Sequence, residues 1–409
     1  LWPQEGDADG EFYGFNGANL GDLDGDGVDD LLATSSYEFG ENVGHRITSG
    51  ADGVRLSFCP GCGELDYAML GVGDVDGDGI GEWVRASARE VYFLSGTTWH
   101  DTPWLQGFYT DPSPCPDLDS DGLADFALVD LSTHTVVIYS AATRAVIGTI
   151  GGWGQGIPIG DVNADGFADL ALRFTTGVLR GYSGADLSVI YEVPAPDSLG
   201  KTMAAVGDVD GDGAGDFACA APGYRAFSGG PLIGRVALLS GADGATIGEF
   251  LGSEAEVIIE ICSAGDWNQD GVLDIAAGSP SAGFNGVASG RIRFLSGDDL
   301  RTIDRRDGSA ARISLQLIAP VETIPGQDGP GLFFTEGRYN GQGFDRGRIG
   351  LLASHCRADF NCDGTSNTQD VLAFLNAFVA GELAADANFD DVLDSRDVLA
   401  FLNPWAQGC

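Results

Sequence analysis

Short apolar segments alternate with acidic, glycine-rich loops over the first 354 residues of the chain. Leu31–Ala33, Asp125–Val129 and Asp274–Gly278 are typical of these segments, and each directly follows an acidic loop. Segments this short, bounded by Gly and Asp, predict β-strands joined by tight turns. Apolar residues at helical spacing are absent from the region, so we expect an all-β structure there.

A further apolar segment in most units ends in the dipeptide Ser-Gly. It occurs at Val91–Gly96, Val178–Gly184, Arg235–Gly241 and Arg291–Gly297. A turn such as Ala242–Gly244 then leads to another short apolar segment. Each unit therefore predicts one small antiparallel sheet.

The acidic loop itself recurs six times, at intervals of 43 to 58 residues. The copies open at Asp22, Asp74, Asp117, Asp161, Asp208 and Asp266. Self-similarity with a period of this length is typical of solenoids and propellers. A closed array of related units, rather than two or three unrelated domains, is the expected organisation.

Each copy carries oxygen-bearing side chains at loop positions 1, 3, 5 and 9 and glycine at position 6. Carboxylates at this spacing can surround one Ca²⁺, the glycine permits the turn, and the backbone carbonyl of position 7 adds a ligand. The expected ligands are Asp22, Asp24, Asp26, Val28, Asp30; Asp74, Asp76, Asp78, Ile80, Glu82; Asp117, Asp119, Asp121, Leu123, Asp125; Asp161, Asn163, Asp165, Phe167, Asp169; Asp208, Asp210, Asp212, Ala214, Asp216; and Asp266, Asn268, Asp270, Val272, Asp274.

A seventh, degenerate unit is expected near residue 350. Arg346–Leu352 matches the strand that elsewhere ends in Ser-Gly, and Pro325–Leu332 stands where the acidic loop belongs. Only Asp328 and Gly329 of the motif remain, so this loop is expected to hold no calcium. The unit also lacks its outer strand, which residues 1–20 are expected to supply, closing the ring.

The motif Gly-Asp-x-Asp-x-Asp-Gly-x-x-Asp before an apolar strand resembles the FG-GAP repeat family, the seven-bladed β-propeller known from integrin α-subunits. The resemblance covers residues 1–354, and its departures are Glu82, Asn163, Asn268 and Pro116. It implies a seven-bladed β-propeller whose calcium loops are structural and lie on one face. Function would then reside on the opposite face or on the rim.

Residues 355–409 differ in character and predict a small helical domain. Two loops with oxygen ligands at positions 1, 3, 5, 9 and 12 each precede an apolar segment with helical spacing, Val371–Phe378 and Val398–Asn403. In the second loop Asp391 replaces the glycine at position 6, which weakens the expectation of calcium there. The expected ligands are Asp359, Asn361, Asp363, Thr365, Asn367, Asp370 and Asp386, Asn388, Asp390, Val392, Asp394, Asp397.

This tandem loop–helix arrangement resembles the dockerin module of secreted bacterial proteins. In dockerins the residues at loop positions 10 and 11 recognise a cohesin partner. In this chain these positions are occupied by Thr368-Gln369 in the first loop and Ser395-Arg396 in the second. The two pairs differ, so binding by either half is not implied. A calcium-stapled terminal cap or sorting tag without a cohesin remains the alternative.

The chain is strongly acidic, with a formal charge of −40 from 61 acidic and 21 basic residues. Eight calcium ions would bring this charge to about −24. Such a surface repels nucleic acid and anionic membranes, so neither is an expected partner. No run of 18 apolar residues occurs, so membrane insertion is not expected.

Eight cysteines and calcium loops of extracellular style favour an oxidising, secreted or cell-surface location. The start at Leu1, without Met or a signal peptide, fits a processed form. Cys59–Cys62 is interpreted as a short loop disulfide rather than a redox motif. Other expected pairs are Cys219 with Cys262 and Cys356 with Cys409, and Cys115 and Cys362 stay unassigned.

Catalytic motifs are not recognised. The histidines at 45, 100, 134 and 355 stand in unrelated contexts, and the sequence contains no Gly-x-Ser-x-Gly elbow or phosphate-binding loop. Two carboxylates suited to glycoside cleavage stay an open alternative among 61 acids. The aromatic residues Trp99, Trp104, Phe108–Tyr109, Phe12–Tyr13 and Phe15 can stack on sugars, although core packing is favoured, and the insertion Ala221–Pro231 is a candidate recognition loop.

These patterns together predict a secreted, calcium-binding protein without enzymatic activity. The propeller would serve protein–protein contact or adhesion. The C-terminal module would bind a protein partner or other copies of the chain, which could build extracellular polymers. The alternative is a polysaccharide-binding or polysaccharide-degrading propeller attached to a larger complex.

Overall fold

A computed structural model describes most of the chain. The described residues are 3–5, 13–35, 44–60, 68–86, 89–98, 103–254, 256–282, 289–308, 315–321, 330–336, 348–353, 358–361 and 365–407. Within them, no helix is long and apolar enough to cross a membrane.

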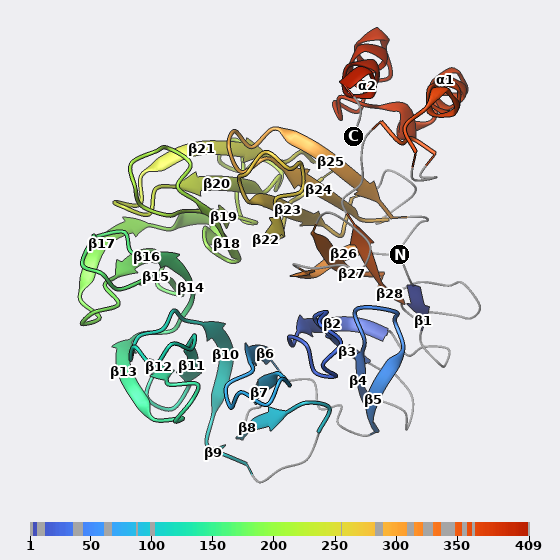
Figure 1. Cartoon of the computed structure of the whole chain (residues 1–409). Coiled ribbons are helices and arrows are strands. Elements are labelled where there is room, and N and C mark those ends of the chain that lie inside the picture. Colours follow the sequence, from blue (N-terminus) through green and yellow to red (C-terminus); the bar gives the residue numbers. More distant parts are fainter. Residues whose placement is uncertain are drawn as a thin grey trace.

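The described strands form seven four-stranded antiparallel sheets arranged as a ring (Figure 1). Six sheets each contain four consecutive strands, and the seventh combines β26, β27 and β28 with β1. We call these sheets blades 1 to 7, in chain order. Their number equals the number of units that the sequence predicts, and the all-β propeller is confirmed.

The strand bounds follow the repeat. Blade 1 is β2 (Tyr13–Asn19), β3 (Leu31–Ser35), β4 (Gly44–Thr48), β5 (Arg55–Pro60); blade 2 is β6 (Ala68–Gly73), β7 (Glu82–Ala86), β8 (Glu90–Ser95), β9 (Leu105–Gln106). Blade 3 is β10 (Tyr109–Pro114), β11 (Phe126–Asp130), β12 (Thr135–Tyr139), β13 (Val146–Gly151); blade 4 is β14 (Gly154–Gly160), β15 (Asp169–Phe174), β16 (Val178–Tyr182), β17 (Val189–Pro194). Blade 5 is β18 (Met203–Gly207), β19 (Asp216–Ala220), β20 (Arg235–Leu239), β21 (Thr246–Leu251); blade 6 is β22 (Glu260–Gly265), β23 (Asp274–Ser279), β24 (Arg291–Leu295), β25 (Thr302–Asp307). Blade 7 is β26 (Leu315–Val321), β27 (Gly331–Glu336), β28 (Arg348–Ala353) and β1 (Pro3–Glu5).

The two ends of the repeat region close the ring together. Strand β1 pairs antiparallel with β28, with Pro3 opposite Gly350 and Glu5 opposite Arg348. The prediction that the N-terminal segment supplies the outer strand of the seventh unit is therefore confirmed. This pairing covers the edge of β28, which would otherwise offer unpaired backbone groups to other chains.

The core lies between neighbouring blades. Successive side chains of a strand point to opposite faces of its sheet. Trp83 belongs to an apolar cluster with Leu32 and Ile47 of blade 1, whereas the next residue, Val84, belongs to a cluster with Phe126 of blade 3. Because both faces of these blades are covered, their second strands are mostly apolar instead of alternating between apolar and polar residues.

Cysteine placement corrects one expected disulfide. Cys219 and Cys262 are both free thiols, although they lie in neighbouring blades. Cys219 packs in the cluster between blades 4 and 5, and Cys262 packs against the cluster between blades 6 and 7. The two side chains thus point in opposite directions, which prevents a bond. Cys115 is also free, and Cys59 is disulfide-bonded. Its expected partner Cys62 lies outside the described residues, as do the predicted pair Cys356 and Cys409 and the unassigned Cys362.

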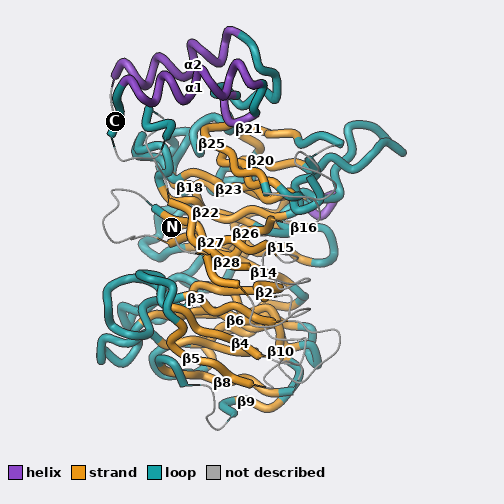
Figure 2. The backbone as a smooth tube through the Cα atoms, turned by 90° about the vertical axis from the view of Figure 1, so that its right-hand side faces the viewer, coloured by secondary structure: helices purple, strands orange, loops and turns teal. Residues whose placement is uncertain are grey.

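Two helices, α1 (Thr368–Ala380) and α2 (Ser395–Gln407), form the C-terminal module, as predicted. The rings of Phe374 and Phe401 stack between them, 4.3 Å apart. Short 3-10 turns occur at Pro196–Ser198 and Leu383–Ala385. The helices lie outside the ring beside the blade that contains β25 (Figures 1 and 2).

Candidate functional site

The six acidic loops all connect the first strand of a blade to its second strand. Loop 1, for example, joins β2 to β3, and loop 4 joins β14 to β15. Because strand direction alternates in an antiparallel sheet, the turn between the third and fourth strands lies on the same side of the blade. The acidic loops therefore share one face with the turns that begin at the Ser-Gly signature.

The carboxylate at position 1 of each loop accepts hydrogen bonds from backbone amides of the same loop. In loop 4, Asp161 accepts hydrogen bonds from the backbone amides of Asp165 at 3.1 Å and Gly166 at 2.9 Å. Asp22 accepts the corresponding bonds in loop 1. The glycine at position 6 has a φ of 93° in loop 4, a conformation that L side chains rarely adopt. These contacts explain why the motif holds Asp and Gly at these two positions.

The acid at position 9 joins the loop to the Ser-Gly turn. Asp30 is fully buried, and it accepts the amide of Leu23 at 2.8 Å and the amide of Gly50 at 3.1 Å. Asp125, Asp169, Asp216 and Asp274 accept equivalent pairs of amides. The position-9 acid is thus a structural link between two connections of the same blade.

The serine of the Ser-Gly signature also reaches the loop, a role that the sequence does not reveal. The Ser183 hydroxyl donates to Asp165 at 2.8 Å, and the Ser49 hydroxyl lies 3.4 Å from Asp26. The recurrence of the Ser-Gly dipeptide was the signal in the sequence, but only the fold brings its serine beside position 5 of the loop. The backbone amide of position 7, predicted only as a carbonyl ligand, donates to the position-5 carboxylate, as Val28 does to Asp26 at 2.9 Å.

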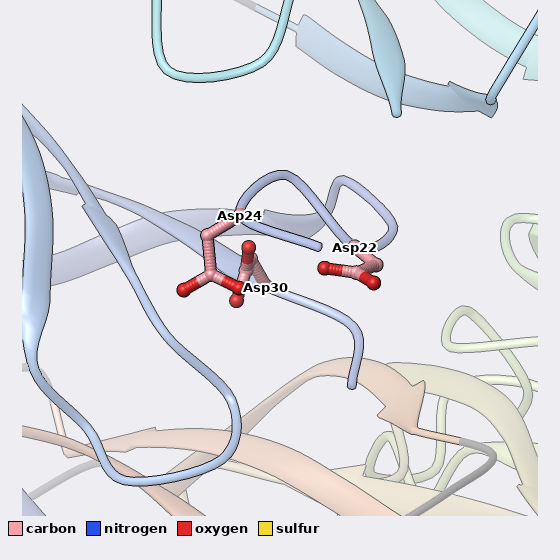
Figure 3. A group of neighbouring side chains, drawn as sticks. All are labelled: Asp22, Asp24 and Asp30. Carbon is pink, nitrogen blue, oxygen red and sulfur yellow. The ribbon is translucent and has the colours of Figure 1, made fainter. Parts of the chain in front are cut away.

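Carboxylate oxygens converge in four of the six loops. Figure 3 shows the group in loop 1, where the carboxylate of Asp22 faces those of Asp24 and Asp30. In each group the three oxygens lie within 4.8 Å of one another: Asp22, Asp24, Asp30; Asp74, Asp76, Asp78; Asp117, Asp119, Asp125; and Asp208, Asp210, Asp216. In loops 4 and 6 the position-3 residue is an amide, and Asn163 and Asn268 donate to Asp165 and Asp270.

Burial disfavours the ionised form of the position-9 acids. It raises the pKa of Asp30 to about 7 and the pKa values of Asp125 and Asp274 to about 6, although backbone hydrogen bonds act in the opposite direction. The pKa values of Asp169 and Asp216 are raised for the same reason. A cation beside these groups would favour the charged form and offset the cost of burial.

One oxygen in loop 2 has no hydrogen-bond partner in the part of the chain that the structure describes. Glu82 is buried, and its Oε2 accepts the amide of Val75 at 2.8 Å, whereas its Oε1 has no hydrogen-bond partner among the described residues. The buried hydroxyl of Ser296, at the signature of blade 6, is likewise without a partner among them. Unsatisfied buried oxygens are costly, and a hard cation is the group that an oxygen-only donor set fits.

Without calcium, stability should rise as the pH falls. The folded-state pKa values of Asp30, Asp125 and Asp274 lie above the ordinary value of 3.8, so their protonated forms favour the folded state. We expect the melting temperature in calcium-free buffer to increase from pH 8 to pH 5. With saturating calcium the increase should disappear, because protons then compete with the metal. A calcium-free protein that is least stable at pH 5 would contradict this expectation.

The first loop of the C-terminal module is only partly described, because Asp363 lies outside the described residues. Asp370 is buried and accepts the amides of Asn361 at 3.1 Å and Asn367 at 2.7 Å. It therefore completes a capping box at the start of α1. The second loop repeats this, since Asp397 accepts the amides of Asn388 and Asp394. The degenerate seventh loop, with Asp328, lies outside the described residues.

The aromatic candidates separate into packed and exposed residues. Trp104 packs edge-on against Phe126 and Tyr139, with ring centroids 5.8 and 4.8 Å away, so packing is confirmed there. Phe108 is 55% exposed. Phe12, Trp99 and the side chains of Tyr13 and Phe15 lie outside the described residues, as do two of the four histidines, His100 and His355. The insertion that contains Ala221–Pro231 connects β19 to β20 and exposes Phe227.

Comparison with known proteins establishes the fold alone. No family model and no curated protein matches the chain. A chain in the crystal structure of BBS1N in complex with ARL6DN, soaked with mercury, superposes with a TM-score of 0.56 at 10% identity, covering 87% of this chain and 96% of that chain. The lead-soaked form gives 0.55 at 11% identity with the same coverage. The Pan2 WD40 domain of Neurospora crassa gives 0.49 at 8% identity, covering 82% and 88%. The two BBS1N structures therefore share the fold of this chain, and the β-propeller that its sheets form suits protein–protein interaction.

Proposed function

We propose that this protein is a calcium-stabilised interaction protein of an extracellular environment, without enzymatic activity. The observation that carries the proposal is the convergence of three carboxylates in each of four equivalent loops. The disulfide at Cys59 supports an oxidising compartment. The acids of the loops are engaged by backbone amides, which favours a structural role over acid–base chemistry.

Calcium would be held by positions 1, 3, 5, 7 and 9 of each propeller loop. Bound there, it would neutralise carboxylates that otherwise repel one another. Asp30 and its equivalents would then fasten the neutralised loop to the Ser-Gly turn of the same blade. The result is a rigid face of the ring, which leaves the opposite face and the rim for partners.

Substitution of one ligand should remove one ion. We expect Asp24→Ala to lower the calcium content of the purified protein by one ion per chain, measured by mass spectrometry of the metal. Asp29→Ala is the matched control, because Asp29 lies in the same loop but accepts a hydrogen bond from Asn19 instead of facing the carboxylate group. An unchanged calcium content in Asp24→Ala would contradict a cation in loop 1.

Partners would be proteins. The similar propeller chain comes from a complex of BBS1N with ARL6DN, and a rigid propeller with variable loops is suited to such contacts. On this chain the β19–β20 connection exposes Phe227, and α1 exposes Leu372 and Val379. We infer that the C-terminal module mediates association with a partner or with further copies of the chain.

Deletion of residues 356–409 tests this role. The truncated protein should stay folded, because the apolar clusters between the blades are formed without the module. If the module mediates self-association, full-length protein in calcium should scatter as a species larger than a monomer, and truncated protein as a monomer. Monomers in both cases would exclude self-assembly and leave a foreign partner.

A further inference from the structure

The second loop of the C-terminal module, residues 386–397, contacts the propeller through charged groups. Arg305 of β25 donates to Asp386 at 2.7 Å and to Asp391 at 2.9 Å. Asp386 is buried, and it is the position-1 acid of this loop. The guanidinium carbon of Arg305 also lies 5.6 Å from the ring centroid of Phe389. Contacts of this density mark a defined interface rather than loosely tethered domains.

Two further arginines, both on β24, complete the contact. Arg291 donates to the two carboxylate oxygens of Asp391 at 3.0 and 3.1 Å. Arg293 donates to the carbonyl oxygen of Phe389 at 3.2 Å. Asp391 thus receives hydrogen bonds from Arg291 and Arg305 while retaining a side-chain exposure of 35%.

The three arginines Arg291, Arg293 and Arg305 form what we call the basic recess of blade 6. The side chain of Arg291 is fully buried and that of Arg293 is 6% exposed. Glu256 bridges them, accepting from Arg293 at 2.6 Å and from Arg291 at 3.2 Å. Asp307 also accepts from Arg291, at 2.5 and 3.1 Å, so the three guanidinium groups face two carboxylates of the propeller itself. Because buried guanidinium groups require anionic partners, the remaining positive charge favours contact with an acidic segment.

Blade 6 is unusual at this position among blades 3 to 6. Arg293 and Arg305 stand directly opposite each other on β24 and β25. The equivalent pairs are Val137 with Thr149, Arg180 with Glu192 and Ala237 with Glu249. Like charges directly opposite one another destabilise a sheet. The pair in blade 6 is therefore balanced by surrounding carboxylates, those of Glu256, Asp307 and the docked loop.

Asp391, the residue by which the second loop departs from the calcium motif, has a structural role. Asp391 occupies position 6, where the propeller loops have glycine, and it adopts the same left-handed backbone with a φ of 64°. A non-glycine residue in this conformation carries an energetic cost. The cost is offset because Asp391 presents its carboxylate to Arg291 and Arg305.

A fourth guanidinium group contacts two further predicted ligands of this loop. Arg396 contacts Asp390 at 2.9 Å and Asp394 at 2.8 Å, which are positions 5 and 9. Position 1, Asp386, is bonded to Arg305. In the first loop the residue equivalent to Arg396 is the uncharged Gln369. The second loop therefore has its negative charge balanced by arginines at three of its predicted ligand positions.

We propose that the second loop is a docking element for the basic recess of its own propeller, with guanidinium groups in place of a cation. The loop that sequence similarity assigns to calcium would instead fix the C-terminal module to blade 6. The first loop and α1 would remain available to a partner. The calcium part of this proposal rests on the proposed function, because it compares this loop with the propeller loops.

Docking is tested by hydrogen exchange of the full-length protein. Asp391→Asn removes the charge, and Asn can still adopt the left-handed backbone of this position. We expect this substitution to accelerate exchange at least tenfold in peptides that cover residues 386–397 and β25. Arg305→Gln, on the propeller side, should produce the same change. The control is Arg180→Ala, at the position of blade 4 that is equivalent to Arg293, which should leave these peptides unchanged. Unaltered exchange in both Asp391→Asn and Arg305→Gln would overturn the docking proposal.

Calcium counting tests the replacement of the cation. Asp390→Ala and Asp165→Ala remove the position-5 acid from the second C-terminal loop and from propeller loop 4, respectively. We expect the first substitution to leave the calcium content unchanged and the second to lower it by one ion per chain. Loss of an ion in Asp390→Ala would overturn the inference, whereas no loss in Asp165→Ala would instead contradict calcium in the propeller loop.

Discussion

Removal of calcium is expected to lower the melting temperature of the protein by more than about 10 °C. Each site contributes about 2.7 kcal/mol when calcium exceeds its Kd a hundredfold. Six such contributions would match or exceed the total stability of about 5–15 kcal/mol that is typical of a domain. At about 2–4 °C per kcal/mol, even a third of this sum gives the expected shift.

Thermal unfolding with calcium and with a chelator measures this effect. Readdition of calcium should restore the original transition. Magnesium at equal concentration should restore much less, because it prefers a smaller, octahedral site and keeps its own water ligands. Superimposable melting curves with and without chelator would show that the acidic loops stabilise the fold without a cation.

Truncation of Trp83 is expected to destabilise the propeller more than loss of any one surface side chain. Trp83 is fully buried between blades 1 and 2, and its indole nitrogen donates to the carbonyl of Gly96 at 3.0 Å. Trp83→Ala removes this hydrogen bond and leaves a cavity, at a cost of about 3–5 kcal/mol. The melting temperature in calcium should fall by about 10 °C.

Trp153 supplies the matched control for this substitution. It is 38% exposed and stacks on His134 with ring centroids 5.1 Å apart. Trp153→Ala should therefore change stability by less than about 1 kcal/mol. Equal losses in the two variants would mean that the contact between blades 1 and 2 contributes less than its burial indicates.

The repeat and the family resemblance that it carries were sufficient to predict the propeller and its ring closure. The repeated Asp, Asn and Gly residues are needed by the backbone of each single loop. Asp161, for example, accepts hydrogen bonds from the amides of its own loop, and Gly166 adopts a positive φ. The apolar runs report burial on both faces of a blade. Both signals arise within about ten residues, so they can be read without knowing the fold.

Side-chain direction across blades could not be read in this way. A disulfide between Cys219 and Cys262 was predicted because the two residues lie near each other in the sequence and in neighbouring blades. The prediction was wrong because the two side chains face different interfaces. The Ser-Gly signature was visible, but its contact with position 5 depends on two turns that meet only in the folded blade.

The sequence alone determined that acidic loops recur at fixed positions between short strands, because loop geometry and burial act locally. Only the tertiary structure decided what the atypical loop at residues 386–397 does. Asp391 is separated from Arg291 by 100 residues, and their contact exists because the module lies against blade 6. Long-range charge pairing leaves no periodic trace in a sequence, so it becomes apparent only when the fold places both partners side by side.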